Sequence, residues 1–202
     1  MKAAPKQRRS RETLDRLLDA ANREFAASGL HGVTTTAIAA RAGVSVGSLY
    51  RFFDDKEAIA AAIVEAYLAD AVEAYAPILG TLTEPNDLVP ALRRLVHAAA
   101  DLQRAHPGYY RITQDAPPQS EGAPAAVVRG QLVELFAAEL DRLGVGESKA
   151  ARRRVITLLI ETVRHTLADA DPDAPDRAEI VGELEALAVG YFATRLALDP
   201  NG

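Results

Sequence analysis

The residues whose types and spacing best suit chemistry lie in the stretch 34–57, with the sequence TTTAIAARAGVSVGSLYRFFDDKE. Hydroxyl, guanidinium and ammonium groups recur here along two short predicted helices that are separated by Gly43. Thr34 or Thr35 can cap the first helix, and Ser45 can cap the second. Two short helices joined by a glycine-centred turn are used to present one helix to the major groove of DNA. The stretch therefore predicts a surface that binds duplex DNA.

The spacing of apolar residues divides this motif into an inner and an outer face. The residues predicted to lock the two helices together are Ile38, Ala42, Val44, Leu49 and Phe53. The outer face is left to Ser45, Val46, Gly47, Ser48, Tyr50 and Arg51. A glycine in a helix interior costs about 1 kcal/mol relative to alanine, so Gly47 indicates that another surface approaches the backbone closely. A DNA duplex is the natural candidate for that surface.

The motif resembles the tetracycline-repressor (TetR) family of bacterial regulators. The matching positions are Ile38-Ala39, Ala42-Gly43-Val44-Ser45, Gly47, Tyr50, Phe53 and Lys56-Glu57. With the first predicted helix and its Phe25 and Gly29 ending, the resemblance covers roughly residues 11–70, about a third of the chain. The sequence departs from the pattern at Phe52, where many members carry Tyr or His, and at Leu30, where many carry an aromatic residue.

The resemblance implies a role for each matching residue. Hydroxyl groups of Thr34, Ser45 and Tyr50 would bind phosphates, together with Lys56 and the amide end of the following helix. The base edges would be left to the remaining outer residues, among which Arg51 suits guanine O6 and N7. The full predicted set of DNA contacts is Thr34, Thr35, Ser45, Val46, Gly47, Ser48, Tyr50, Arg51 and Lys56.

The charge distribution agrees with a nucleic-acid-binding N-terminal part. The net charge is −5, yet residues 1–56 carry ten Lys or Arg against six Asp or Glu, whereas the remaining residues carry 13 against 22. A basic N-terminal part joined to an acidic remainder is expected when one domain binds a polyanion and the other does not. The basic tail is either an arm that reaches the minor groove or phosphates, or a solvated disordered end. Its residues are Lys2, Lys6, Arg8, Arg9 and Arg11.

Apolar residues three and four apart recur along the whole chain, which predicts an all-α fold. Gly, Pro and capping residues mark about nine helices, the first from about Arg11 and the third from Ser45 through Phe52. We expect a three-helix DNA-binding domain in residues 1–56 and a helical effector-binding and dimerisation domain in residues 57–202. Because the chain lacks Cys, a secretory start and any apolar run of about 18 residues, we expect a cytoplasmic protein without a membrane segment.

The C-terminal residues show no metal-ligand spacing and no signature of a nucleophile, so neither an enzyme, a cofactor nor a metal site is expected. The resemblance implies a small-molecule cavity between helices, with His97, Tyr109, Tyr110, Gln114 and Thr162 as candidate polar wall residues.

Broad apolar stripes on the last two helices predict a homodimer through a four-helix interface. The expected function is a ligand-responsive repressor on a palindromic operator. The alternatives are an activator, an all-α enzyme that carries the motif, and a helical adaptor that does not bind DNA.

Overall fold

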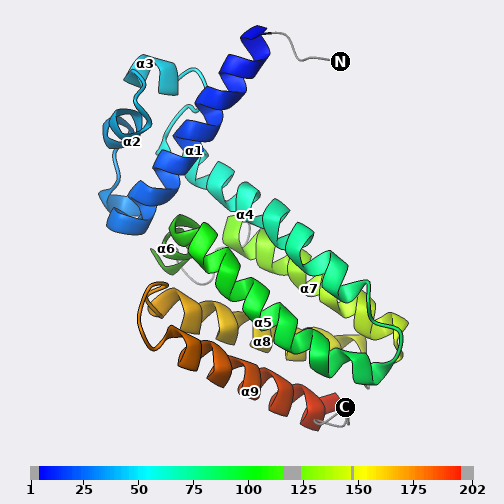
Figure 1. Ribbon diagram of the computed structural model, residues 1–202. Helices are drawn as coiled ribbons and strands as arrows, with labels where there is room; N and C mark the ends of the chain where they lie inside the picture. The colour runs from blue at the N-terminus through cyan, green and yellow to red at the C-terminus, as the bar shows by residue number, and fades with distance from the viewer. Residues whose placement is uncertain (1–4, 116–123, 147, 197–202) are drawn as a thin grey trace. The chain divides into compact units, whose positions relative to one another are not determined.

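A computed structural model of the chain describes residues 5–115, 124–146 and 148–196. Within these residues it contains nine α-helices, one 3-10 helix and no strand, which confirms the predicted all-α class (Figure 1). The helices are α1 (Pro5–Gly32), α2 (Thr35–Ala42), α3 (Val46–Leu49), α4 (Lys56–Leu79), α5 (Leu88–Ala105), α6 (Pro107–Asp115), α7 (Pro124–Arg142), α8 (Lys149–Asp169) and α9 (Arg177–Leu196), with the 3-10 helix η1 (Pro85–Asp87) before α5. Lys2 lies outside the described residues.

Side-chain caps fix where several of these helices begin. Oxygens of Thr34, Ser45, Asp55 and Ser148 each accept a hydrogen bond from the backbone amide three residues later, at 3.1, 3.1, 2.7 and 3.2 Å. Such a cap stabilises a helix by about 1 kcal/mol, because it satisfies an amide that has no partner inside the helix. The starts of α2, α3, α4 and α8 therefore follow from local sequence.

Two helix boundaries differ from the prediction. α1 begins at Pro5 instead of about Arg11, so part of the predicted tail is helical. α3 ends at Leu49 instead of Phe52, because the amides of Phe52 and Phe53 both bond to the Leu49 carbonyl, at 2.9 and 3.1 Å, in a tightened turn. This turn brings the apolar Phe53 side chain into the core, where it is buried.

Contacts divide the described residues into two compact units. The first unit comprises the described residues of Met1–Tyr67 and His106–Ser120, and the second those of Leu68–Ala105 and Glu121–Gly202. The helix α6 therefore belongs with α1, α2 and α3, although its neighbours in sequence, α5 and α7, belong to the second unit.

In the first unit α1 packs against both α2 and α6, and α2 packs against α3. Its largest fully buried side chains are Leu17, Phe25, Ile38, Leu49 and Ile59. A second buried cluster joins α4 to α6, where the rings of Tyr67 and Tyr109 stack with their centroids 3.6 Å apart and Tyr110 meets both rings edge-on. Burial of this apolar surface is the main force that holds the small unit together.

In the second unit α5 packs against α9 and α8, and α8 also packs against α7. Apart from Gln103, the buried face of α5 is apolar. The amide nitrogen of Gln103 donates to the carbonyls of Leu167 and Ala170, the latter at 3.0 Å. These carbonyls lie at the C-terminal end of α8, where the Leu167 carbonyl also accepts from the Ala170 amide at 3.3 Å, so a side chain of α5 adds a donor to the end of this helix.

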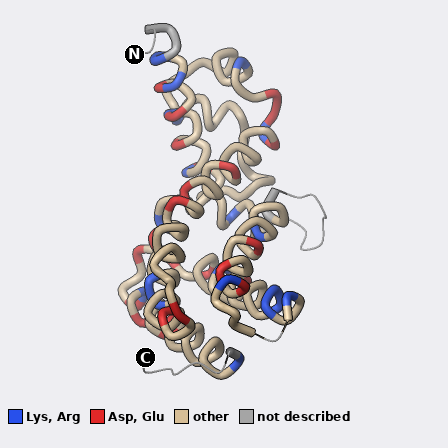
Figure 2. Tube along the Cα trace, turned by 90° about the vertical axis from the view of Figure 1, so that its right-hand side faces the viewer, with Lys and Arg blue, Asp and Glu red and all other residues tan. Residues whose placement is uncertain are grey.

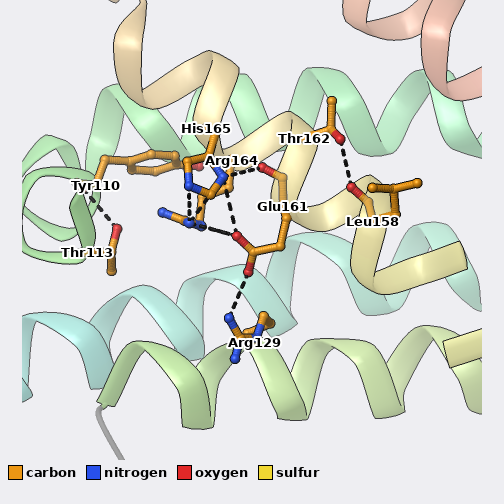
Figure 3. Close-up of polar contacts among 8 residues, drawn as sticks. All are labelled: Tyr110, Thr113, Arg129, Leu158, Glu161, Thr162, Arg164 and His165. Carbon is orange, nitrogen blue, oxygen red and sulfur yellow. Dashed lines mark hydrogen bonds and ion pairs between the residues drawn. The ribbon is translucent and has the colours of Figure 1, made fainter. Parts of the chain in front are cut away.

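An ion-pair cluster joins α7 to α8 (Figure 3). The carboxylate of Glu161 accepts from Arg129 of α7 at 3.1 Å and from Arg164 of α8 at 2.7 Å. Burial raises the pKa of Glu161, but the hydrogen bonds and charges of Arg164 and then Arg129 outweigh it and hold this pKa below its ordinary value. The contribution to stability is therefore present above the pKa of an unfolded glutamate and is lost as the pH falls through the lowered value.

Candidate nucleic-acid interface

The turn between α2 and α3 depends on Gly43. This residue has φ 66° and ψ 36°, in the left-handed region that side chains with a Cβ seldom adopt. Its amide bonds to the carbonyls of Ala39 and Ala40, and the Val44 amide bonds to the Ala39 carbonyl at 3.0 Å. The glycine thus ends α2 and redirects the chain into α3 within two residues.

The predicted inner face of the motif is found in the structure. Ile38 and Leu49 are fully buried, and Ala42 and Phe53 are buried as well. Val44 is only half-buried. Among the remaining residues of α3 and its flanks, Val46 and Ser48 are half-buried, and the others are exposed, namely Ser45, Gly47, Tyr50 and Arg51.

The outer face carries hydroxyl groups that are already oriented. The Tyr50 side chain is 51% exposed, and its hydroxyl lies 3.2 Å from Oγ1 of Thr35 at the start of α2. At the start of α3 the hydroxyls of Ser45 and Ser48 lie 2.9 Å apart. These contacts bring together hydroxyls from both helices of the motif, and each hydroxyl retains capacity for a further hydrogen bond.

Arg51 and Gly47 are the least constrained residues of this face. Arg51 is exposed, and the structure shows no ion pair for it among the residues that it describes; the nearby carboxylate of Asp55 caps α4 instead. A Cβ placed on Gly47 would meet no atom within 4 Å, so the fold of the subunit does not require glycine there. Both residues are available to a partner molecule.

Lys56 has a contact that the sequence did not indicate. Its ammonium group donates to the carbonyl of Leu30, 3.1 Å away, at the end of α1 where Gly29 departs from helical geometry. A positive charge beside the last carbonyls of a helix is favourable. Lys56 therefore holds the end of α1 beside the start of α4, and its other N–H groups remain potential donors to a phosphate.

A second contact was also missed by sequence reasoning. Arg41 at the end of α2 donates to the carboxylate of Glu24 on α1, whose side chain is largely buried. Both residues stand on ordinary polar positions of their helices, so no local pattern pairs them. The ion pair adds a polar link to the apolar contact between α1 and α2.

The basic residues near the N-terminus lie on a helix. Arg8, Arg9 and Arg11 occupy the first turns of α1 and are exposed, and Arg8 pairs with Glu12 at 3.4 Å. An exposed pair of this kind contributes little to stability and is easily exchanged for another partner.

The second unit has a different distribution of charge. Figure 2 shows acidic and basic residues interspersed along the helices of the second unit.

The residues predicted to line an effector cavity fall into both units. Tyr109 and Tyr110 are buried in the aromatic cluster of the first unit, and Gln114 of the same helix accepts from Arg111 at 3.5 Å. In the second unit His97 is exposed on α5, 3.2 Å from Glu185 of α9, and the Thr162 hydroxyl donates to the Leu158 carbonyl on α8 (Figure 3). Of the five candidate residues, only Tyr109 and Tyr110 contact each other through their rings. Tyr67 of α4, which is not among the candidates, contacts both of these rings.

His97 also borders a hollow of about 520 Å³ between α5 and the start of α9, whose lining includes Asp101, Arg104, Asp173 and Arg177. Within the described residues no group of His, Asp and Glu side chains could hold a metal ion. Within the same residues no helix is long and apolar enough to cross a membrane.

Comparison with known proteins matches this arrangement to one family over most of the chain. Residues 17–63 match the family model of bacterial regulatory proteins of the tetR family, and residues 87–192 match that of the tetracyclin repressor-like C-terminal domain. The chain belongs to the TetR family of transcriptional regulators.

Individual relatives share part of the sequence or the whole fold. The chain is 33% identical over 95 residues to the HTH-type transcriptional repressor KstR2 of Rhodococcus jostii, and the match spans 47% of each protein, about half the relative's length. A TetR-family regulator from Streptomyces coelicolor is 27% identical, with 91% of this chain and 99% of that chain covered and a TM-score of 0.67. The ketosteroid regulator KstR2 of Mycobacterium tuberculosis shares the fold at 22% identity, with 90% and 91% covered and a TM-score of 0.62.

The free space around Gly47 leads to the first prediction. Gly47→Ala should raise the free energy of unfolding by up to about 1 kcal/mol, because alanine favours the helix and meets no neighbour. If DNA approaches the backbone at this position, as the sequence predicts, the same change should weaken duplex binding, because a methyl group would then stand in the contact. Urea unfolding and duplex titration measure the two effects. Gly130→Ala, at another helical glycine with open surroundings, is the control and should leave DNA binding unchanged.

The contact of Lys56 leads to the second prediction. Lys56→Ala should lower the free energy of unfolding by about 1 kcal/mol, through loss of the bond to Leu30, and should also weaken binding to any duplex. If Lys56 binds a phosphate, the slope of log affinity against log salt should fall by about one unit. Lys149→Ala, at an exposed lysine of α8, is the control. An unchanged salt slope in Lys56→Ala would restrict Lys56 to its structural contact.

Proposed function

We propose that this regulator is a repressor that binds a palindromic operator as a homodimer and releases it when a small molecule binds to the C-terminal part of the chain. The observation that carries the proposal is the capped pair α2 and α3, which buries its apolar face and leaves Tyr50, Arg51 and Gly47 exposed. DNA contacts would come from residues 1–56, and effector and dimer contacts from residues 57–202. A regulator of this kind acts in the cytoplasm.

The contacts with DNA would be of two kinds. Thr34, Thr35, Ser45 and Tyr50 would give hydroxyl hydrogen bonds to phosphates, and Lys56 would add a charge-assisted one. Base edges would be read by the residues of α3 and its C-terminal flank, namely Val46, Gly47, Ser48 and Arg51. Arg51 has the planar fork that binds guanine O6 and N7 with two hydrogen bonds, and in the described structure no carboxylate holds it elsewhere.

Repression is supported by the name of the Rhodococcus relative, a transcriptional repressor, which matches about half of this chain. The sign of regulation depends on where the operator lies relative to a promoter, and an activator would use the same contacts. An adaptor that binds only proteins would not require the paired hydroxyls of Thr35 and Tyr50. Selection of bound duplexes distinguishes the adaptor, which would enrich no sequence, and the position of the selected operator relative to a promoter distinguishes an activator.

The dimer would form through α8 and α9. Several stripe residues, such as Val155, Val163 and Leu184, are buried within the subunit, but Leu158 and Leu187 are 53% and 49% exposed. On α9 the exposed positions 183, 187, 190 and 194 share one face, and Gly190 on this face has no atom within 4 Å of a built Cβ. A glycine without a neighbour in its own subunit is consistent with close approach by a second helix.

The effector would act by changing the separation of the two recognition helices, since a dimer reads half-sites about one helical turn apart. Coupling between two binding sites is reciprocal, so the effector must bind the free dimer more tightly than the DNA-bound dimer. A compound with equal affinity for both states cannot release the operator. The candidate residues for its site remain His97, Tyr109, Tyr110, Gln114 and Thr162.

Selection of bound duplexes from a random pool tests DNA binding directly, and the selected palindrome then tests Arg51. Arg51→Ala should lose about 1–3 kcal/mol of binding free energy on the selected operator and little on a scrambled duplex, because base contacts depend on sequence. Tyr50→Phe should weaken both duplexes by similar factors, since phosphates are the same everywhere. Failure to enrich any sequence would favour the adaptor. Equal losses for Arg51→Ala on both duplexes would remove it from base reading.

The dimer interface gives a separate prediction. In sedimentation velocity the wild-type protein should have twice the mass of one chain, and Leu187→Glu should raise the dimer dissociation constant at least about hundredfold, because two charges enter an apolar contact. Val127→Glu, at an exposed valine of α7 that is also 49% exposed, is the matched control and should remain dimeric. A monomeric wild-type protein at micromolar concentration would contradict the proposal.

A further inference from the structure

One face of α9 is left exposed by its own subunit and has an uneven distribution of charge. Its exposed residues, counted from the position before the helix, are Asp176, Glu179, Glu183, Leu187, Gly190 and Thr194. Spacings of three and four residues place side chains on one side of a helix. The first half of this face carries three carboxylates, and the second half carries no charge. Among the described residues the structure shows ion pairs for Glu185 of α9, but none for these three carboxylates.

The acidic half of this face borders a hollow of about 600 Å³ between α8 and α9, which we call the acidic groove. Besides the three carboxylates it is lined by Thr166 of α8 and by the apolar residues Ile180, Leu184 and Leu187 of α9. The described residues that line it include no Lys or Arg. A long cationic side chain suits such a groove, because its apolar stem can lie along the apolar residues while its charged end meets the carboxylates.

α8 carries an exposed cation on the side that also holds an exposed leucine. Arg154 and Leu158 are both exposed and lie four residues apart, so they share one side of the helix. The preceding arginines, Arg152 and Arg153, form ion pairs with Asp141 and Glu134. For Arg154 the structure shows no ion pair among the residues that it describes. Its guanidinium group can therefore bind a carboxylate outside its own subunit.

The antiparallel arrangement of α8 and α9 relates the heights of residues on the two helices (Figure 1). Thr166 and Ile180 line the same hollow, so they lie at about the same height. Eight residues further from the connection between the helices, about 12 Å at 1.5 Å per residue, Leu158 of α8 stands at about the height of Leu187 of α9. These two leucines are 53% and 49% exposed. They define the middle of the exposed surface of the helix pair.

The unpaired charges lie on opposite sides of this middle. Arg154 is about 6 Å further from the connection between the helices, and Glu183 is about 6 Å nearer to it. A two-fold axis through the middle and perpendicular to the helices exchanges the two sides, so Arg154 of one copy comes to the height of Glu183 of the other. A two-fold axis parallel to the helices would instead bring the acidic ends of both copies together, where like charges repel.

We propose that the acidic groove binds Arg154 of a second copy of the chain, and that the two symmetric contacts set which ends of the two copies meet. The stem of Arg154 lies along Ile180 and Leu184, and its guanidinium group binds Glu183. The leucines of the middle, Leu158 and Leu187, are covered in the same contact. The inference rests on the proposed function, because it requires a dimer through α8 and α9, and it adds the orientation of the two copies and the residues that select it.

The experiment uses charge reversals in the full-length chain. Arg154→Glu and Glu183→Arg are made singly and together. Glu73→Arg, at an exposed carboxylate of α4 for which the described residues show no ion pair, is the matched control. Sedimentation velocity gives the dimer dissociation constant of each protein, and circular dichroism gives its helix content. In a second measurement the two single variants are mixed in equal amounts, and native mass spectrometry counts homodimers and heterodimers.

Each single reversal should raise the dimer dissociation constant at least about tenfold, because two attractive pairs become two repulsive ones. The double variant should return to within about threefold of the wild type, because both pairs are restored with their signs exchanged. The control should match the wild type. In the mixture both pairs are attractive only in the heterodimer, which should form about 90% of the dimers, whereas random pairing gives about half.

Single variants that dimerise as tightly as the wild type would overturn the inference and leave the acidic groove to a different basic partner. A double variant as weak as the single ones, or random pairing in the mixture, would overturn it as well, since the two residues would then not meet across the interface. If the wild-type protein is monomeric, the proposed dimer itself has failed, and this is seen before any variant is compared.

Discussion

The DNA-binding surface depends on a helix that cannot hold its own shape. α3 is four residues long, and an isolated helix of that length is unstable in water. Its geometry is imposed by the left-handed turn at Gly43 on one side and by burial of Leu49 on the other. Neighbouring elements therefore contribute to recognition, because α2 packs against α3 and α1 packs in turn against α2.

This dependence explains why so many polar contacts of the first unit join distant helices. Lys56 connects the start of α4 to the end of α1, Arg41 connects α2 to Glu24 of α1, and Asn22 caps α6. None of these contacts touches α3 directly. Each joins helices of the unit that contains α3, in which α2 packs against α3 and α1 packs against α2.

Local features of this structure could be predicted from sequence, whereas contacts between helices could not. The caps at Thr34, Ser45 and Asp55 and the turn at Gly43 involve residues at most five positions apart, so the local sequence is enough to predict them. The bonds of Lys56, Arg41 and Asn22 join residues 26, 17 and 86 positions apart. Their partners are a backbone carbonyl, one of many glutamates and a glycine amide, and only packing selects them.

The effector residues illustrate a second limit. A polar or aromatic residue in an amphipathic helix can line a cavity, join the core or face solvent, and helical periodicity gives only the side of its own helix. Tyr109 and Tyr110 became core residues of the first unit because Tyr67 of α4 provides a stacking partner. His97 lies on the outer face of α5, where Glu185 of α9 meets it. Which face of α5 or α6 is inward depends on neighbours that the periodicity does not identify.

Some glycines of the chain are required by the fold of the subunit, and others are not. Gly43 requires its left-handed backbone, and Gly108 requires the space that Asn22 occupies, so both are explained within the subunit. Gly47, Gly130, Gly182 and Gly190 lie in helices with nothing near a built Cβ, so the fold of the subunit requires none of these four glycines. Among them, Gly47 lies on the outer face of the helix-turn-helix motif, and Gly190 lies on the exposed face of α9 that also carries Leu187. Under the proposed function a duplex approaches at Gly47 and a second copy of the chain at Gly190, whereas no partner is assigned to Gly130 or Gly182.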